Sequence, residues 1–256
     1  MELLKTFGLF YAVVFLRYAI VAFVAWQVFY KWKLHAWLYR KIQQKLPTSA
    51  DVRRELAYSA ITSVLFAVVG ILFLWQKGPL HPYTQMYADS NAYGWPYFLA
   101  ALGVMLIVHD TYFYWMHRLM HHPALFKKFH VLHHKSTNPS PWAAFAFQPS
   151  EALVEAGIVP LLACLLPLHV HHFLVFFLIM IVYNVYGHLG WELYPKKLLK
   201  HPVGKWLNTS VSHNQHHQYF KGNYGLYFTY WDVWMGTLRK DYTARYTAVT
   251  EAKKEG

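Results

Sequence analysis

Three clusters of histidine stand out in the sequence because their spacing suits metal binding. They are His117 with His121, then His130-Val-Leu-His133-His134, and finally His213-Asn-Gln-His216-His217. On a helix, residues four positions apart lie on one face about a turn from each other, so His117 and His121 can bind one ion together. In the two longer clusters, histidines three positions apart share a face and the adjacent histidine turns about 100° away. Each longer cluster can therefore supply ligands to two neighbouring ions.

The residue inventory narrows the kind of metal. The 256 residues include one cysteine, Cys164, which excludes an intrachain disulfide and a cysteine-based metal cage. Imidazole ligands alone suit zinc, copper, iron or nickel. A zinc site needs only three or four ligands, and the eight histidines of the clusters exceed that number. Two ions per chain fit better, and iron is favoured if the site attacks an inert C–H bond, because that chemistry needs a redox metal.

A helical stripe connects the first cluster to a carboxylate. Asp110, Tyr114, His117 and His121 follow one another at steps of four, three and four residues. We therefore expect Asp110 to accept a hydrogen bond from an imidazole N–H and to fix its tautomer. His109 lies about 80° away from this stripe, so it is left out of the ligand set. The remaining histidines are interpreted as packed, interfacial or loop residues: His35, His81, His122, His169, His171 and His172.

The elements that must position these clusters are membrane-spanning helices. Only 14% of the residues are charged and 56% are hydrophobic, whereas a soluble domain has about 25% charged residues. Spans of about 20 apolar residues are expected at 7–30, 56–75 and 97–116. Two shorter apolar segments, 152–168 and 173–186, predict a helical hairpin that enters the membrane and returns. The predicted fold is an all-α, multi-pass membrane protein with about three full spans, the hairpin and a histidine-rich metal-binding cap.

The charge distribution predicts the orientation of these segments. The net charge is +12, and 21 of the 24 Lys and Arg residues fall in 31–54, 117–149 and 189–256. Three spans and a hairpin place all of these regions, together with the histidine clusters, on one side. The positive-inside rule makes that side cytoplasmic. The same rule explains the basic charge without nucleic acid, which we do not expect as a partner.

The histidine clusters and their neighbours resemble the fatty acid hydroxylase/sterol desaturase superfamily. The resemblance rests on His109-Asp110, on 114–121, on 129–134, on 212–225 and on the closing Tyr-Trp-Asp-Val-Trp-Met-Gly-Thr at 230–237. The segment 141–149 is closest to the sterol-desaturase-like branch, although that branch would have histidine where this chain has Gln148. The chain is interpreted as one integral-membrane domain, 1–256, with a catalytic region at 97–240.

The resemblance implies a set of metal ligands. They are His117, His121, His130, His133, His134, His213, His216 and His217, joined by His188 in Gly-His-Leu-Gly-Trp-Glu at 187–192. Asn184 precedes His188 by one turn and is expected to orient it. Asp232 is expected to shape the C-terminal segment rather than to bind metal. Glu151 and Glu155 share one face of the following helix, where they would orient a ligand, contact a substrate head group or simply be solvated.

The resemblance also implies a function: a di-iron oxidase that uses O₂ to hydroxylate or desaturate a lipid. Its substrate would be a sterol, fatty acyl or sphingolipid molecule from the bilayer. Electrons would come from an external donor of the cytochrome b5 or ferredoxin type. The membrane would be a bacterial cytoplasmic membrane or the endoplasmic reticulum. A membrane zinc hydrolase and a non-enzymatic metal transporter are the alternatives, but the HExxH signature of many zinc hydrolases is absent from the sequence.

Overall fold

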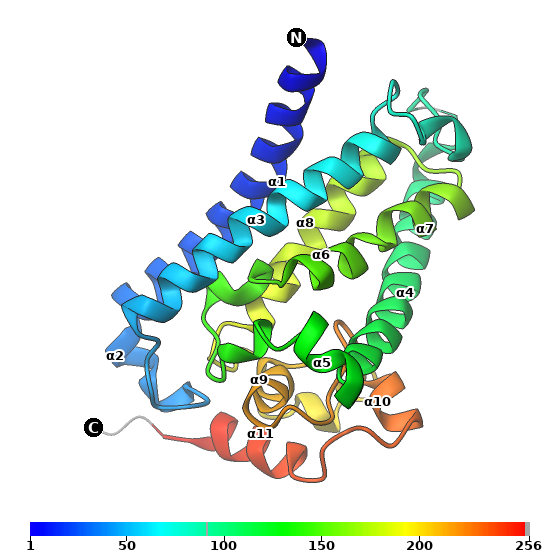
Figure 1. Ribbon diagram of the computed structural model, residues 1–256. Helices are drawn as coiled ribbons and strands as arrows, with labels where there is room; N and C mark the ends of the chain where they lie inside the picture. Colours follow the sequence, from blue (N-terminus) through cyan, green and yellow to red (C-terminus); the bar gives the residue numbers. More distant parts are fainter. Residues whose placement is uncertain (91, 254–256) are drawn as a thin grey trace.

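Long apolar runs and well-defined helix ends give the chain its main elements in this computed structural model, which describes residues 1–90 and 92–253 (Figure 1). The long helices are α1 (Glu2–Trp26, continued by a π-helical stretch, Gln27–Trp32), α3 (Ser49–Leu74), α4 (Gly94–Met120) and α8 (Val170–Gly187). The short helices are α2 (Leu34–Trp37), α5 (Pro123–Phe129), α6 (Pro149–Ala156), α7 (Ile158–Leu165), α9 (Ser210–Tyr219), α10 (Tyr230–Trp234) and α11 (Tyr242–Glu251). The described residues contain no strand, so the all-α prediction is confirmed.

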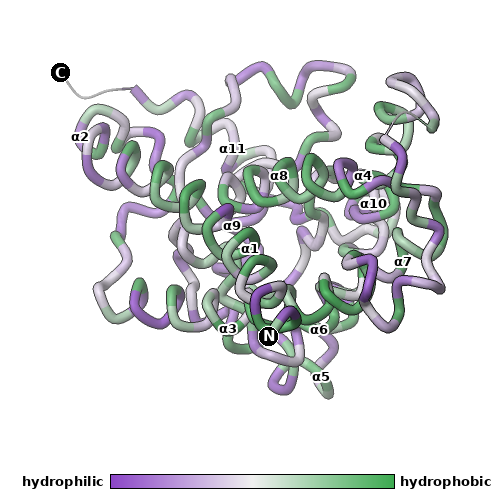
Figure 2. Tube along the Cα trace, turned by 90° about the horizontal axis from the view of Figure 1, so that it is seen from above, coloured by the Kyte–Doolittle hydropathy of each residue, from purple (hydrophilic) through white to green (hydrophobic). Residues whose placement is uncertain are grey.

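The four long helices are long and apolar enough to cross a membrane. In Figure 2 the tube is mainly hydrophobic along α1 and α8. Only 11% of the most apolar stretch of Glu2–Trp32 is buried inside the protein, so the rest of this hydrophobic surface needs lipid to cover it. The chain is therefore an integral membrane protein. The predicted hairpin corresponds to the short helices α6 and α7 followed by α8, and α8 itself reaches spanning length.

Local sequence explains where these helices begin and end. Thr48 and Asp51 form a capping box at the start of α3. Pro123 opens α5 and His122 caps it, accepting a hydrogen bond from the Ala124 amide. Gly157 separates α6 from α7, and a Cβ at that position would lie 2.3 Å from the Tyr112 hydroxyl oxygen. Only glycine therefore lets Tyr112 donate its hydrogen bond to the Val154 carbonyl.

The segment between the second histidine cluster and α6 is held at the centre of the helices. Its turn Pro141–Phe145 packs against α1, α3 and α8. The Trp142 carbonyl accepts hydrogen bonds from the Tyr18 hydroxyl on α1 (2.8 Å) and the Ser59 hydroxyl on α3 (3.2 Å). The Ala144 carbonyl accepts from the Asn184 amide on α8 (2.9 Å). These polar contacts between buried groups fix the turn, and with it the neighbouring histidines.

Candidate metal centre

All nine histidines of the predicted ligand set lie together where α4, α8 and α9 meet the segment 130–134. They form two groups, in each of which the candidate ligand nitrogens lie within 4.8 Å of one another. The first group contains His117, His121, His130, His134 and His216, and the second contains His133, His188, His213 and His217. The groups are neighbours, since the ring centroids of His134 and His217 are 4.9 Å apart. The arrangement offers two adjacent metal sites.

The division of each longer cluster differs in one respect from the prediction. Histidines four positions apart share a group, as His213 and His217 do, whereas His216 joins the other group. At 3.6 residues per turn, positions four apart differ by about 40° around a helix and positions three apart by about 60°. The same division separates His133 from its neighbours in the second cluster. Each longer cluster thus faces both sites, with a different pairing from the one expected.

The nitrogen atoms that meet at the centre of each group are arranged as ligands around a cation would be. His117 donates its Nδ1–H to the Tyr224 carbonyl (2.9 Å), and His130 Nδ1 lies 2.6 Å from the Glu151 carboxylate. A neutral imidazole that donates through Nδ1 carries a lone pair on Nε2. The Nε2 atoms of these two rings nevertheless face each other at 3.0 Å. With both rings donating through Nδ1, the two lone pairs would repel at that distance unless a cation lay between them.

The second group repeats this arrangement. His188 donates Nδ1–H to the Asn184 carbonyl (2.8 Å), His133 Nδ1 is 3.4 Å from the Ala146 carbonyl, and their Nε2 atoms are 3.3 Å apart. Metal–imidazole bonds of about 2.1 Å place neighbouring ligand nitrogens roughly 3.0–3.4 Å apart in octahedral or tetrahedral geometry. The Nε2–Nε2 separations quoted for the two groups, 3.0 and 3.3 Å, fall in that range. The residues therefore fit two metal ions.

Burial keeps these imidazoles in the neutral form that binds metal. It lowers the pKa of His188 to about 4 and, together with the adjacent His117, lowers the pKa of His121 to about 2. Burial and neighbouring imidazoles also hold six further histidine pKa values well below the ordinary value. These belong to His130, His133, His134, His213, His216 and His217.

Asp110 does not accept a hydrogen bond from an imidazole, so that expectation is wrong. Its Oδ1 atom accepts from the backbone amides of Tyr227 (2.7 Å) and Phe228 (3.1 Å). Asp232 holds the same loop, accepting from the amides of Tyr224 (2.9 Å) and Gly225 (2.8 Å). Because the Tyr224 carbonyl accepts from His117, both aspartates act on the histidine through the loop. Helical spacing placed Asp110 on the face of α4 that carries the histidines. It could not show that amides of a distant loop, and not an imidazole, donate to the Asp110 carboxylate.

Three further positions clarify the sequence-based expectations. Asn184 contacts His188 as expected, but through its backbone carbonyl, because its side-chain amide is bonded to Ala144. Gln148, which replaces an expected histidine, donates to the Lys128 carbonyl and belongs to neither group. His109 also lies outside both groups and its Nδ1 is 3.0 Å from the Tyr227 hydroxyl. Each group contains at least four histidines without a ligand at position 148.

Glu151 has the role that was expected of Asp110. Its carboxylate contacts His130 Nδ1, and both side chains are almost fully buried. A carboxylate behind a metal-binding histidine fixes the ring and increases its basicity. Glu155, one turn later, is buried as well, at 9% exposure, so this helix end is not solvated. The sequence placed both carboxylates on one face, and only the fold shows that they serve different surroundings.

An apolar cavity of about 290 Å³ lies between α1, α3, α4, α6, α7 and α8, and aromatic rings of its wall separate it from the grouped histidines. Two of its walls are the rings of Phe113, 5.0 Å from the His117 ring, and Phe147, 5.2 Å from the His133 ring. At the opposite end it is lined by Leu9 and Val170, which are also exposed on the outer surface of α1 and α8. The cavity thus leads from the surface that faces lipid toward both candidate metal sites.

Comparison with known proteins identifies the family of this chain. The model of the fatty acid hydroxylase family matches residues 102–237, more than half of the chain. The chain belongs to the fatty acid hydroxylase family. The matched region contains all nine grouped histidines together with Asp110, Glu151 and Asn184.

Among the similar proteins are sterol-modifying enzymes. A Delta(7)-sterol 5(6)-desaturase of Gibberella zeae is 31% identical over 63% of this chain and 49% of its own length. Another, from Aspergillus fumigatus, is 30% identical over 74% of this chain and 63% of its own. Mouse lathosterol oxidase is 29% identical over 74% of this chain and 62% of its own. The chain thus spans between half and two thirds of these relatives, and no solved structure matches it significantly.

Proposed function

We propose that this protein is a membrane di-iron oxidase that desaturates or hydroxylates a lipid of the sterol class. The observation that carries the proposal is the end of the apolar cavity, where Phe113 and Phe147 touch one histidine of each group. A lipid in this cavity would bring a C–H bond toward both sites, from which these two rings separate it. The alternatives of zinc hydrolysis and metal transport do not account for an apolar cavity that ends at two adjacent sites.

The two histidine groups would each hold one iron ion. Iron bound there would supply the activation of O₂ and the removal of hydrogen from an unactivated C–H bond. The protein contributes position: carbonyl oxygens of Tyr224 and Asn184 orient His117 and His188. The carboxylate of Glu151 orients His130. Asp110 acts at one remove, by fixing the loop that carries Tyr224, and Phe113 and Phe147 keep water from the buried side.

The substrate class follows from the cavity and from the relatives. The cavity lining is mostly aliphatic and aromatic, and its far end opens at membrane-facing residues of α1 and α8. Such a site suits a lipid that enters sideways from the bilayer. The relatives act on Delta(7)-sterols and lathosterol, as their names state. We therefore infer a sterol-like substrate in preference to a soluble one.

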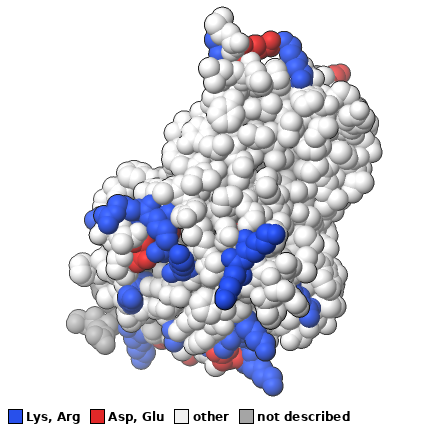
Figure 3. Space-filling model, in the orientation of Figure 1, with Lys and Arg blue, Asp and Glu red and all other residues white. Residues whose placement is uncertain are grey.

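The basic end of the molecule is proposed to face the cytoplasm and to receive electrons there. Lys and Arg residues gather around α2, α5 and the C-terminal helices, on the half of the molecule that holds the histidines (Figure 3). The positive-inside rule assigns this end to the cytoplasmic side. A basic surface also favours a partner with an acidic surface, as a cytochrome b5-like or ferredoxin-like electron donor would present.

The test is oxidation of a defined sterol by the purified protein. The protein is reconstituted in lipid nanodiscs, reduced chemically and given lathosterol with O₂. Mass spectrometry then measures a product two hydrogens lighter or one oxygen heavier. We expect product with the wild type and none with His133→Ala, although the variant still inserts into membranes. Product formation by His133→Ala, or without O₂, would contradict the proposal.

A further inference from the structure

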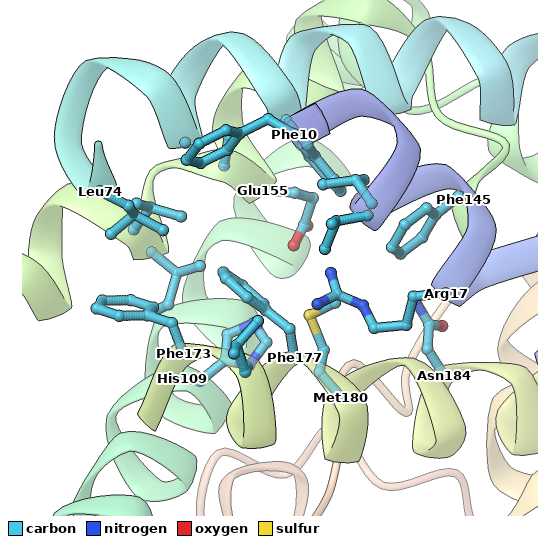
Figure 4. A pocket seen from close by; sticks show the side chains of 18 of the residues that line it. Phe10, Arg17, Leu74, His109, Phe145, Glu155, Phe173, Phe177, Met180 and Asn184 are labelled. Carbon is cyan, nitrogen blue, oxygen red and sulfur yellow. The ribbon is translucent and has the colours of Figure 1, made fainter. Parts of the chain in front are cut away.

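The apolar cavity contains two ionisable side chains that the metal sites do not use. Arg17 extends from α1 and Glu155 from α6, and both line the cavity. Figure 4 shows the guanidinium of Arg17 and the carboxyl group of Glu155 pointing into the cavity from different sides, among Phe10, Phe177 and Met180. Neither residue belongs to the two histidine groups. Charged side chains within membrane-spanning segments are costly, and they commonly mark a binding site.

Neither group has a hydrogen-bond or ion-pair partner among the residues that the structure describes. The Arg17 Nε atom is buried without an acceptor, and the Arg17 guanidinium carbon lies 5.1 Å from the centre of the Phe177 ring. The Glu155 side chain is equally without a partner although the residue is only 9% exposed. The two groups are not within ion-pair distance of each other. Because both side chains line the cavity, a polar group of a ligand inside it can approach each of them.

The other two polar side chains of the cavity wall, Asn184 and His109, each make one hydrogen bond within the protein. The side-chain amide of Asn184 donates to the Ala144 carbonyl, and His109 Nδ1 contacts the Tyr227 hydroxyl. A ligand that enters the cavity meets its strongest donor in the guanidinium of Arg17 and its strongest acceptor in the carboxyl group of Glu155, in an apolar surrounding. Leaving either one unpaired next to a hydrocarbon would cost binding free energy.

We propose that Arg17 and Glu155 bind the hydroxyl group of an alcohol substrate, and so select which lipid enters the cavity. A hydroxyl is the small group that accepts from the guanidinium and donates to the carboxylate at once. A carboxylate ligand would satisfy Arg17 but would bring a second acid against Glu155, and a hydrocarbon or an ether would leave Glu155 without a donor. We call this pair of side chains the hydroxyl anchor. A sterol carries one hydroxyl on an apolar body, so the anchor would name the group by which the substrate of the proposed function is recognised. Its role in catalysis rests on that proposed function.

The test measures binding rather than turnover. Protein in lipid nanodiscs is equilibrated with tritiated lathosterol, octadecanol, the methyl ether of each, and octadecanoic acid. The variants are Arg17→Gln, Glu155→Gln and Arg17→Lys. Arg53 is exposed, so Arg53→Gln is the matched control for the loss of a positive charge outside the cavity. Gel filtration and iron content are followed in each sample, so that a variant that fails to fold is recognised. Arg17→Lys retains a charged donor and identifies effects of packing alone.

We expect wild type and Arg53→Gln to bind at least one alcohol about 10- to 100-fold more tightly than its ether, the range for a hydrogen bond to a charged group. Arg17→Gln and Glu155→Gln should each remove most of this preference, and Arg17→Lys should keep part of it. An undiminished preference in both glutamine variants, or equal binding of alcohols and ethers by the wild type, would overturn the anchor. So would a preference for octadecanoic acid that depends on Arg17.

These outcomes separate the anchor from the proposed function. Absence of iron or of product would refute the oxidase while the binding preference still supports the anchor. Selective binding of octadecanol without lathosterol would keep the anchor and refute the sterol assignment. Loss of the preference in the two glutamine variants, with iron and product formation intact in the wild type, would support both.

Discussion

Replacing Glu151 with glutamine should weaken the first metal site and leave the second largely unchanged. The Glu151 carboxylate lies 2.6 Å from Nδ1 of His130, and both side chains are buried. Its second oxygen, Oε2, is buried without a partner among the described residues. The glutamine side chain would keep one acceptor for His130 but would lose the negative charge, and its NH₂ group would need an acceptor where Oε2 now lies. Both changes reduce the donor strength and the fixed orientation of His130.

The size of the effect follows from the kind of contact. A hydrogen bond to a charged group contributes about 1.5–3 kcal/mol, and each 1.4 kcal/mol is a tenfold change in affinity. Glu151→Gln should therefore weaken binding of one ion about 10- to 100-fold. This agrees with the general effect of changing a carboxylate behind a metal-binding histidine. His133, His188 and the rest of the second group have no contact with Glu151 among their hydrogen bonds.

The assay is iron retention against a graded series of chelator concentrations, with iron per chain measured by elemental analysis. The wild type should release both ions at high chelator, and Glu151→Gln should release one at a concentration about 10- to 100-fold lower. Glu155→Gln, one helical turn away and also buried, is the matched control and should follow the wild type. Release of both ions together, or identical curves for Glu151→Gln and wild type, would refute the reasoning.

Three other changes test separate parts of the structure. His134→Ala should lose mainly the first ion and His133→Ala mainly the second, because these adjacent residues belong to different groups. Identical spectra of the iron that remains in the two variants would contradict this. Gly70→Ala should lower the free energy of unfolding by about 1–3 kcal/mol, because the new Cβ would lie 2.8 Å from Cδ1 of Phe10 on α1. In a thermal unfolding assay, adding Phe10→Leu to the same chain should restore the lost stability. Asp232→Asn should lower the free energy of unfolding by about 1–3 kcal/mol and accelerate iron loss, because the Asp232 carboxylate accepts from two backbone amides and the Thr237 hydroxyl. An unchanged melting temperature together with an unchanged rate of iron release would exclude this role.

The spacing of residues along the sequence predicted those features that depend on neighbouring residues in the chain. The apolar runs placed the long helices, and the clusters with their family resemblance brought the candidate ligands into one set. The pairing within clusters was less predictable, because His133 lies on a turn, His133–Lys135, whose direction depends on the packing of Pro141–Phe145 against three helices. The role of Asp110 was missed because its partners, the amides of Tyr227 and Phe228, are more than 110 residues away.

The cavity was not visible in the sequence for the same reason. Arg17 interrupts the first apolar run, and Glu155 follows Glu151 by one turn, but nothing local shows that α1 and α6 face each other. The contact of Glu151 with His130 likewise crosses from α6 to the second histidine cluster. Tertiary packing thus decides which carboxylate serves the metal site and which lies beside the substrate cavity.

The most direct test of the central claim is the metal content of the protein. The protein is purified in detergent under low oxygen from cells grown in iron-rich medium, and iron and zinc per chain are determined by elemental analysis. Two groups of neutral histidines, all buried except the half-buried His121, predict about two iron atoms per chain, with fewer in His134→Ala and in His133→Ala. One zinc and no iron per chain would contradict the di-iron oxidase.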